Sequence, residues 1–304
     1  MIKKISYVLL ILVATGCTIN RKDEYNPLTL MSFQPVMHIA TKADTGLEDY
    51  PEGQSFAISA WTLDKKYNWK EHSSLAGMYL NYEPVHFSAD FGWNIECGAI
   101  WPERGLNMTV IGYTPIRCFE GCTRNDGAVC SYNMLNSQED LLYTEPQADM
   151  DKVEKHGLIV LPFKHALAQV DFKVKNRVYN GEEIIIKSIK IDEVRYRGYF
   201  TSLPEPSWAT GQETATLYFF EGSQATGMNP ENIGYSWNVI PQALNTRVTV
   251  EYEYRTSPTT GFTQTKKTCD LETNLIPGRH YTYTLSVGIE DVKFLLEFIE
   301  DRFI

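Results

Sequence analysis

The sequence lacks an apolar run long enough to cross a bilayer, and it has no internal repeat and no low-complexity tract. It also lacks several motifs of common enzymes: His-Glu-x-x-His, Gly-x-Ser-x-Gly, a Walker loop and Gly-x-Gly-x-x-Gly. Its six histidines are scattered along the chain. We therefore expect no catalytic residues, no metal site and no cofactor. A secreted hydrolase stays an alternative, because the sequence cannot show whether two carboxylates face each other across a cleft.

Basic side chains are in the minority. The chain has 28 Lys and Arg against 38 Asp and Glu, a net charge of −10. No cluster of Lys and Arg is present to bind a phosphate backbone, so we exclude nucleic acid as a partner. An acidic surface also repels anionic membranes, so the folded body alone would not bind a bilayer.

The N-terminus has the pattern of a secretion signal. Two lysines precede a short apolar run, Tyr7–Val13, and small residues lead to Cys17. This ending resembles a bacterial lipobox, in which the cysteine is acylated and becomes the new N-terminus. We predict a lipoprotein signal peptide at residues 1–16 and lipidation of Cys17. The alternative is an ordinary signal peptide with an incidental cysteine.

Residues 17–27 are predicted to be a tether. They contain Lys22-Asp23-Glu24, which is similar to the acidic export tag of surface lipoproteins in some Gram-negative bacteria. This similarity implies a surface-exposed lipoprotein of the cell outer membrane, held there by its lipid. The alternative is that these charges only keep the tether solvated.

Five cysteines remain after Cys17. Secretion favours disulfides, although an odd number leaves at least one thiol free or paired between molecules. We expect one or two disulfides in the region 97–130. Reduced buried thiols are an alternative, and a zinc site is a weaker one because Cys118-x-x-x-Cys122 has no second close pair. The five residues are Cys97, Cys118, Cys122, Cys130 and Cys269.

Apolar and polar residues alternate with period two along most of the chain, which indicates an all-β protein. In Val248–Tyr254, for example, apolar residues alternate with Thr249, Glu251 and Glu253. One helical turn is predicted at Ser137–Tyr143, where Ser137 precedes Asp140 by three residues. The other predicted strands are Phe56–Trp61, Val85–Phe91, Met108–Tyr113, Leu158–Phe163, Val170–Val174, Ile184–Ile191 and Tyr281–Val287.

The length suits two β-sandwich domains, with a boundary near residue 165. We predict an N-terminal domain at 28–164 and a C-terminal domain at 165–304. Trp61, Trp93 and Trp101 lie in or beside predicted strands, so we expect them in the core rather than at a sugar-binding surface. His165 is expected to be a hydrogen-bonded packing residue rather than a ligand.

Seven phrases in the right order resemble the fimbrillin family, the type V pilin proteins of Gram-negative anaerobes. The resemblance extends over nearly the whole chain, although Lys42 stands where the family has an arginine. The phrases are Thr41-Lys42-Ala43, Gly53–Trp61, Ala99–Pro102, Leu106–Pro115, Asp140–Tyr143, Leu161–Phe172 and Pro277–Leu285.

The resemblance implies two tandem transthyretin-like domains and a polymer built by strand exchange. In the family, a trypsin-like protease removes the first strand, and a strand of another subunit fills the groove. Here the removable segment would be residues 28–42, with cleavage between Lys42 and Ala43. The donor would be the tail, residues 289–304, with its alternating Val292, Phe294, Leu296 and Phe298. The tail is alternatively the last strand of its own domain.

The sequence thus predicts a non-enzymatic structural subunit of a bacterial surface fimbria (pilus) that supports cell adhesion. Its partners would be other fimbrial subunits, the maturation protease and, through the lipid, the outer membrane. The alternative function is that of an outer-membrane glycan-binding lipoprotein, with exposed Trp and Tyr rings as stacking platforms.

Overall fold

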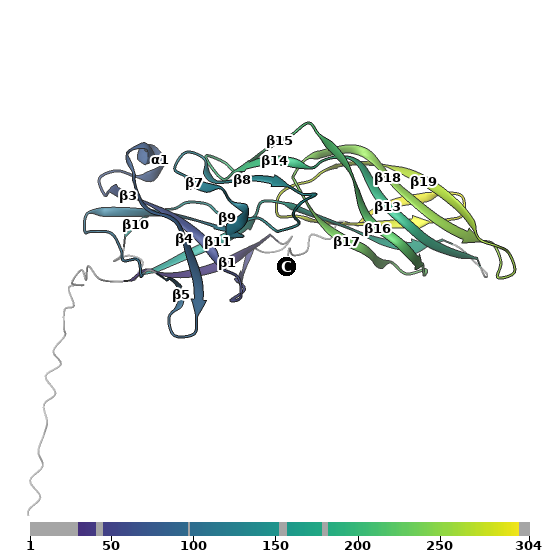
Figure 1. The fold of residues 1–304 in the computed structure, drawn as a ribbon, viewed down its shortest axis with the longest axis horizontal. Coiled ribbons are helices and arrows are strands. Elements are labelled where there is room, and N and C mark those ends of the chain that lie inside the picture. The colour runs from purple at the N-terminus through teal and green to yellow at the C-terminus, as the bar shows by residue number, and fades with distance from the viewer. Residues whose placement is uncertain (1–29, 41–44, 97, 152–156, 178–181, 298–304) are drawn as a thin grey trace, which may run out of the picture.

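The computed structural model describes residues 30–40, 45–96, 98–151, 157–177 and 182–297. The molecule is elongated, with the N-terminal strands at one end and the C-terminal strands at the other (Figure 1). The described chain is almost entirely β-structure, as the alternation predicted. Within it, no helix has the length and apolar character needed to span a membrane.

The N-terminal sheet curls until it closes on itself. Its strands follow the order β6-β3-β4-β5-β1-β11-β9, and β9 pairs with β6 again, Tyr113 standing opposite Tyr143. We call this closed sheet the barrel. β2 (Thr45–Asp49) pairs with β1, and β10 (Gln147–Met150) pairs with β6. The barrel strands are β1 (Ser32–Ala40), β3 (Phe56–Asp64), β4 (Gly77–Ser88), β5 (Gly92–Ile95), β6 (Leu106–Thr114), β9 (Leu142–Thr144) and β11 (Leu158–His165).

A smaller sheet covers part of the barrel's outside. It consists of β7 (Gly121–Thr123), β8 (Gly127–Asn133), β14 (Arg197–Thr201) and β15 (Ser207–Thr210). β3 is therefore buried on both faces: Phe56 and Ile58 belong to the core inside the barrel, whereas Ala57 and Trp61 belong to a second core that includes Cys130 of β8. This double burial explains why β3 is apolar almost throughout.

The C-terminal strands form two facing four-stranded sheets. The rings of Phe172 and Phe219, one from each sheet, lie 4.8 Å apart in the core between them. One sheet contains β12 (Ala168–Asn176), β17 (Glu231–Val239), β20 (His280–Val287) and β21 (Val292–Glu297). The other contains β13 (Glu183–Arg195), β16 (Thr214–Ala225), β18 (Ala243–Arg255) and β19 (Thr263–Asn274).

The division at residue 165 remains a prediction. β14 and β15 follow that position in the sequence, but β14 pairs with β8, which precedes it. One apolar core also contains residues from both sides of position 165, such as Trp61 and Val287. A boundary placed only by sequence order would therefore divide the small sheet.

The predicted helical turn at Ser137–Tyr143 is wrong. The chain is irregular from 137 to 140, and β9 begins at Leu142. The Tyr132 hydroxyl donates to the carbonyl oxygens of Ser137 and Glu139, and the Asp140 carboxylate pairs with His165, so none of these groups serves a helix.

The helical turns of the described chain are all short. They are α1 (Trp69–His72), η1 (Ser73–Leu75) and η2 (Ile116–Cys118). Asn68 caps α1, because its side-chain oxygen accepts from the Glu71 backbone N–H at 2.9 Å. Its side-chain nitrogen donates to the Glu71 carboxylate at 3.1 Å. The second bond holds the two side chains together at the start of α1. It is not the bond of a capping box, in which the Glu side chain accepts from the backbone N–H of the N-cap residue.

Candidate functional site

β1 is held by one strand along one edge and by two strands along the other. Its residues Ser32 to Met37 pair in parallel with β11. On the opposite edge it pairs with β5 at one position, Phe33 opposite Trp93, and further along with β2. The neighbouring strand in the barrel on this side, β5, thus contributes a single residue pair to holding β1.

One face of β1 fills the barrel. Phe33 belongs to the buried core inside it, as does Met31 just before the strand, and the partly buried Met37 packs against that core. The Phe33 ring packs edge-on against Phe56, with centroids 6.4 Å apart. Burying such a side chain contributes about 1.5–3 kcal/mol. Without β1, the barrel would have an open apolar slot between β5 and β11, which we call the β1 slot.

The predicted processing sites lie outside the described residues. Lys42 and Ala43 stand in the sequence between β1 and β2, which pair as an antiparallel hairpin. The signal peptide, the tether and Cys17 also lie outside the described residues. Their roles therefore remain predictions.

The predicted donor tail is the last strand of its own sheet. β21 pairs antiparallel with β20, so that Val292 stands opposite Val287, Phe294 opposite Leu285, and Leu296 opposite Tyr283. Phe298 lies beyond the described residues. In this single chain the described part of the tail, up to residue 297, does not pair with β1 or with its neighbours in the barrel. The described part of the tail is therefore a strand of its own sheet, the alternative named above. The structure of one chain does not test whether the tail enters a second subunit.

The disulfides expected among the described cysteines are absent. Cys118, Cys122, Cys130 and Cys269 are free thiols, whereas Cys97 lies outside the described residues. Burial raises the pKa of Cys122 far above its usual value and that of Cys130 to about 12. Thiolates are therefore scarce at these positions, and the thiols behave as small apolar groups of the core.

His165 is a packing residue, as predicted. It is 8% exposed, and its Nδ1 lies 2.6 Å from the Asp140 carboxylate. A similar pair joins His280 to Asp171, with 2.6 Å between Nε2 and Oδ2. Burial opposes ionisation of Asp171, but hydrogen bonds led by His280 outweigh it and lower the pKa of this carboxyl group. Both pairs cross-link chain segments that are distant in sequence.

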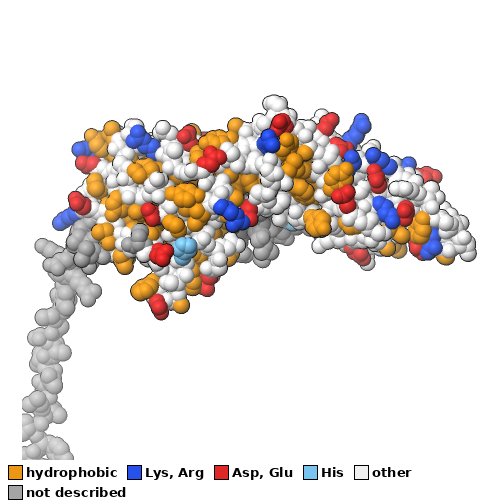
Figure 2. All heavy atoms as spheres, in the orientation of Figure 1, with side chains coloured by type: hydrophobic (Ala, Val, Ile, Leu, Met, Phe, Trp, Pro, Cys, Tyr) orange, Lys and Arg blue, Asp and Glu red, His pale blue; other side chains and the backbone are white. Residues whose placement is uncertain are grey.

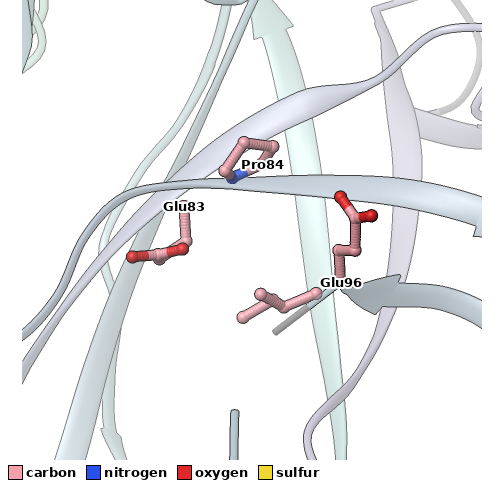
Figure 3. A pocket seen from close by; sticks show the side chains of 4 residues that line it. Glu83, Pro84 and Glu96 are labelled. Atoms are coloured by element: carbon pink, nitrogen blue, oxygen red, sulfur yellow. The ribbon is translucent and has the colours of Figure 1, made fainter. Parts of the chain in front are cut away.

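The described residues offer little for catalysis or metal binding. Among them, no group of three or more His, Cys, Asp and Glu side chains is arranged to hold a metal ion. Glu83 and Glu96 line an open pocket of about 260 Å³ beside Pro84 and Ile95. Their carboxyl groups do not point toward each other (Figure 3). This pocket therefore lacks the facing carboxylates that a glycosidase needs.

The tryptophans provide no exposed stacking surface. Trp61 and Trp101 are buried, as predicted, and Trp93 is partly buried against the barrel core. All six tryptophans lie in the described chain, and each is buried or partly buried.

Comparison with known proteins identifies the family. The profile of the fimbrillin-like family matches residues 41–297. The chain belongs to this family, which supports the role of a fimbrial subunit. Among curated protein sequences, none matches it.

Two solved structures of similar fold are Bacteroides proteins. A fimbrial protein from Bacteroides vulgatus is 15% identical, with a TM-score of 0.67 over 87% of this chain and 99% of that one. A candidate cell adhesion protein from Bacteroides ovatus is 11% identical, with a TM-score of 0.59 over 92% and 99%. At this identity the similarity establishes the fold alone.

Proposed function

We propose that the protein is a structural subunit of a bacterial surface fimbria, that it assembles by protease-triggered strand exchange, and that it supports cell adhesion. Membership of the fimbrillin-like family supports the fimbrial role. The observation that carries the assembly mechanism is the position of β1, an apolar strand of a closed barrel that pairs with β5 only through Phe33 and Trp93.

In this proposal, cleavage between Lys42 and Ala43 separates β1 from the rest of the chain. Loss of β1 opens a slot with an apolar floor. Backbone groups are then unpaired on both its edges, which are β11 on one side and β5 with β2 on the other. Such a slot accepts any strand of matching alternation, because the strand gains main-chain hydrogen bonds and buries its side chains. The donor is the tail of another copy, whose Val292, Phe294, Leu296 and Phe298 repeat the alternation of β1.

The tail must leave β20 before it can enter another subunit. Among the described strands, β21 lies at the edge of its sheet and pairs with β20 alone, so its release breaks one ladder of hydrogen bonds. Entry into the β1 slot would provide ladders on two edges instead of one. This gain supplies a driving force for exchange that does not require a chemical energy source.

Lipidation of Cys17 would place the precursor in the outer membrane, facing outward, until the protease acts. Cleavage after Lys42 would then separate the folded body from the fragment that carries both the lipid and β1. One cut would thereby both detach the subunit and open its slot.

Treatment of the purified full-length protein with a trypsin-like protease tests this function. We expect a ladder of oligomers on a gel that disappears on boiling. The rival glycan-binding function predicts instead an unchanged monomer that gives a signal on a glycan array. The rival has no exposed tryptophan to use, and its stacking platforms would have to be exposed tyrosines such as Tyr235.

A further inference from the structure

The hairpin between β4 and β5 projects from the barrel (Figure 1), and Figure 2 shows hydrophobic side chains at the end of this projection. Phe91 lies in the turn of this hairpin, and its side chain is 76% exposed. The Ser88 hydroxyl accepts from the Phe91 backbone N–H at 3.3 Å and from the Asn94 side-chain amide at 3.0 Å. The same amide donates to the Gly92 carbonyl at 2.9 Å. These bonds hold the turn, so that Phe91 is presented in a defined position.

The stem of the hairpin is stiffened by aromatic contacts that continue into the barrel. The ring centroids of Phe87 and Trp93 lie 5.5 Å apart. Trp93 in turn contacts Phe56 and Tyr50, each with centroids 5.4 Å apart, inside the barrel. The exposed turn is therefore connected to the rigid core through packed rings.

The hairpin also forms one wall of the β1 slot. β5 is the neighbour of β1, and Trp93 is the residue that pairs with Phe33. A strand that replaced β1 would lie about 5 Å from β5, the spacing of adjacent strands. The subunit that donates this strand must then come close to the hairpin. A second copy of this chain is thus the partner that assembly itself would bring to Phe91.

We propose that the hairpin turn, residues 88–92, is a docking element that contacts the body of the incoming subunit through Phe91. This inference rests on the proposed function and adds to it a contact outside the exchanged strand. An exposed phenylalanine on a preorganised turn loses little conformational freedom on binding. Aromatic side chains that become buried at the centre of an interface often carry much of its affinity. The contact would hold the incoming subunit while its tail enters the slot.

The test compares Phe91→Ser with Tyr235→Ser in the full-length protein after protease treatment. Tyr235 is a matched control, because it is 72% exposed but lies on β17 in the C-terminal sheets. Light scattering and unboiled gels would follow assembly. We expect Phe91→Ser to assemble about 30-fold more slowly than the wild type, the effect of losing one strong interface anchor. Tyr235→Ser should assemble at the wild-type rate.

Circular dichroism should give the same melting temperature for both variants and the wild type, because neither side chain is in the core. Phe91→Leu keeps an apolar side chain and should recover most of the assembly rate. If Phe91→Ser assembles like the wild type, or if Tyr235→Ser is slowed equally, the docking role is wrong while the fimbrial function stands. If treated wild-type protein forms no oligomers, strand exchange fails and the docking role fails with it.

Discussion

Asp171 on β12 and His280 at the start of β20 are joined across two parallel strands by a contact of 2.6 Å. The pKa of Asp171 is lowered from 3.8 because the hydrogen bonds outweigh burial. The ionised Asp171 therefore contributes fully to the free energy of unfolding above about pH 3.8. This contribution is lost as the pH falls through the lower pKa that Asp171 has in the folded state.

We therefore expect Asp171→Asn to lower the free energy of unfolding by about 2 kcal/mol near pH 5. The gap to the wild type should narrow as the pH falls below about 4. Urea unfolding across this range measures the gap. Asp270→Asn is the control, because the Asp270 side chain is 93% exposed. A gap that stays constant with pH would contradict the assignment.

Gly234 on β17 allows β16 and β17 to approach closely. Its φ is +74°, and a methyl group there would overlap the carbonyl oxygen of Phe219. We expect Gly234→Ala to lower the free energy of unfolding by about 3 kcal/mol or more, from backbone strain and steric overlap. Gly261→Ala should change it by less than about 0.5 kcal/mol, because no heavy atom lies within 4 Å of its added carbon. Chemical denaturation of both variants would measure the difference.

Cys17→Ala should abolish lipidation. Each buried methylene of an acyl chain contributes about 0.8 kcal/mol of membrane affinity, whereas the acidic body contributes none. Growth with labelled palmitate, followed by fractionation, should find the label in the parent protein and not in the variant. Incorporation into both would show that the anchor is elsewhere.

Lys42→Ala should prevent maturation. N-terminal sequencing of the protease-treated parent should read Ala43-Asp44-Thr45, and the variant should keep its original N-terminus and stay monomeric. Lys70→Ala is the control, because Lys70 is an exposed lysine away from the predicted cleavage site. A new N-terminus at another residue would remove Lys42 from the mechanism.

Phe294→Asp should block assembly after cleavage. An aspartate at this position would have to enter an apolar slot, which costs several kcal/mol if the charge stays unpaired. The control is Lys293→Asp, which introduces an aspartate at the exposed position directly before Phe294. Circular dichroism must first show that Phe294→Asp is folded, since β21 also pairs with β20. A folded variant that polymerises normally would mean that the donor strand is another segment.

Alternation in the sequence was enough to predict most strands. Val248, Val250 and Tyr252 are buried on one face of β18, as their spacing indicated. On β20, the alternating residues Tyr281, Tyr283 and Leu285 are likewise buried. The alternation thus identifies the apolar face of each strand, but it does not show that the polar residues between are buried too, as Thr249, Thr282 and Thr284 are.

Long-range pairing was not readable in the same way. The closure of the barrel depends on Tyr143 meeting Tyr113, and the small sheet depends on Phe200 meeting Cys130. The alternation within a strand does not indicate which other strand it pairs with. The disulfide prediction was wrong for the described cysteines for a related reason. Secretion favours disulfides in general, but whether a given cysteine packs in the core as a free thiol depends on the fold.

The small sheet also sets an order of events during synthesis. β8 ends at Asn133, but its partner β14 begins only at Arg197. Until that later segment has emerged, β8 has an unpaired edge, and Cys130 lacks the strand that stands beside it in the final fold. Unpaired strand edges of this kind are prone to aggregate. The segment up to β8 must therefore be protected from aggregation until β14 has been synthesised. A chain truncated between β8 and β14 would be a substrate for proteases.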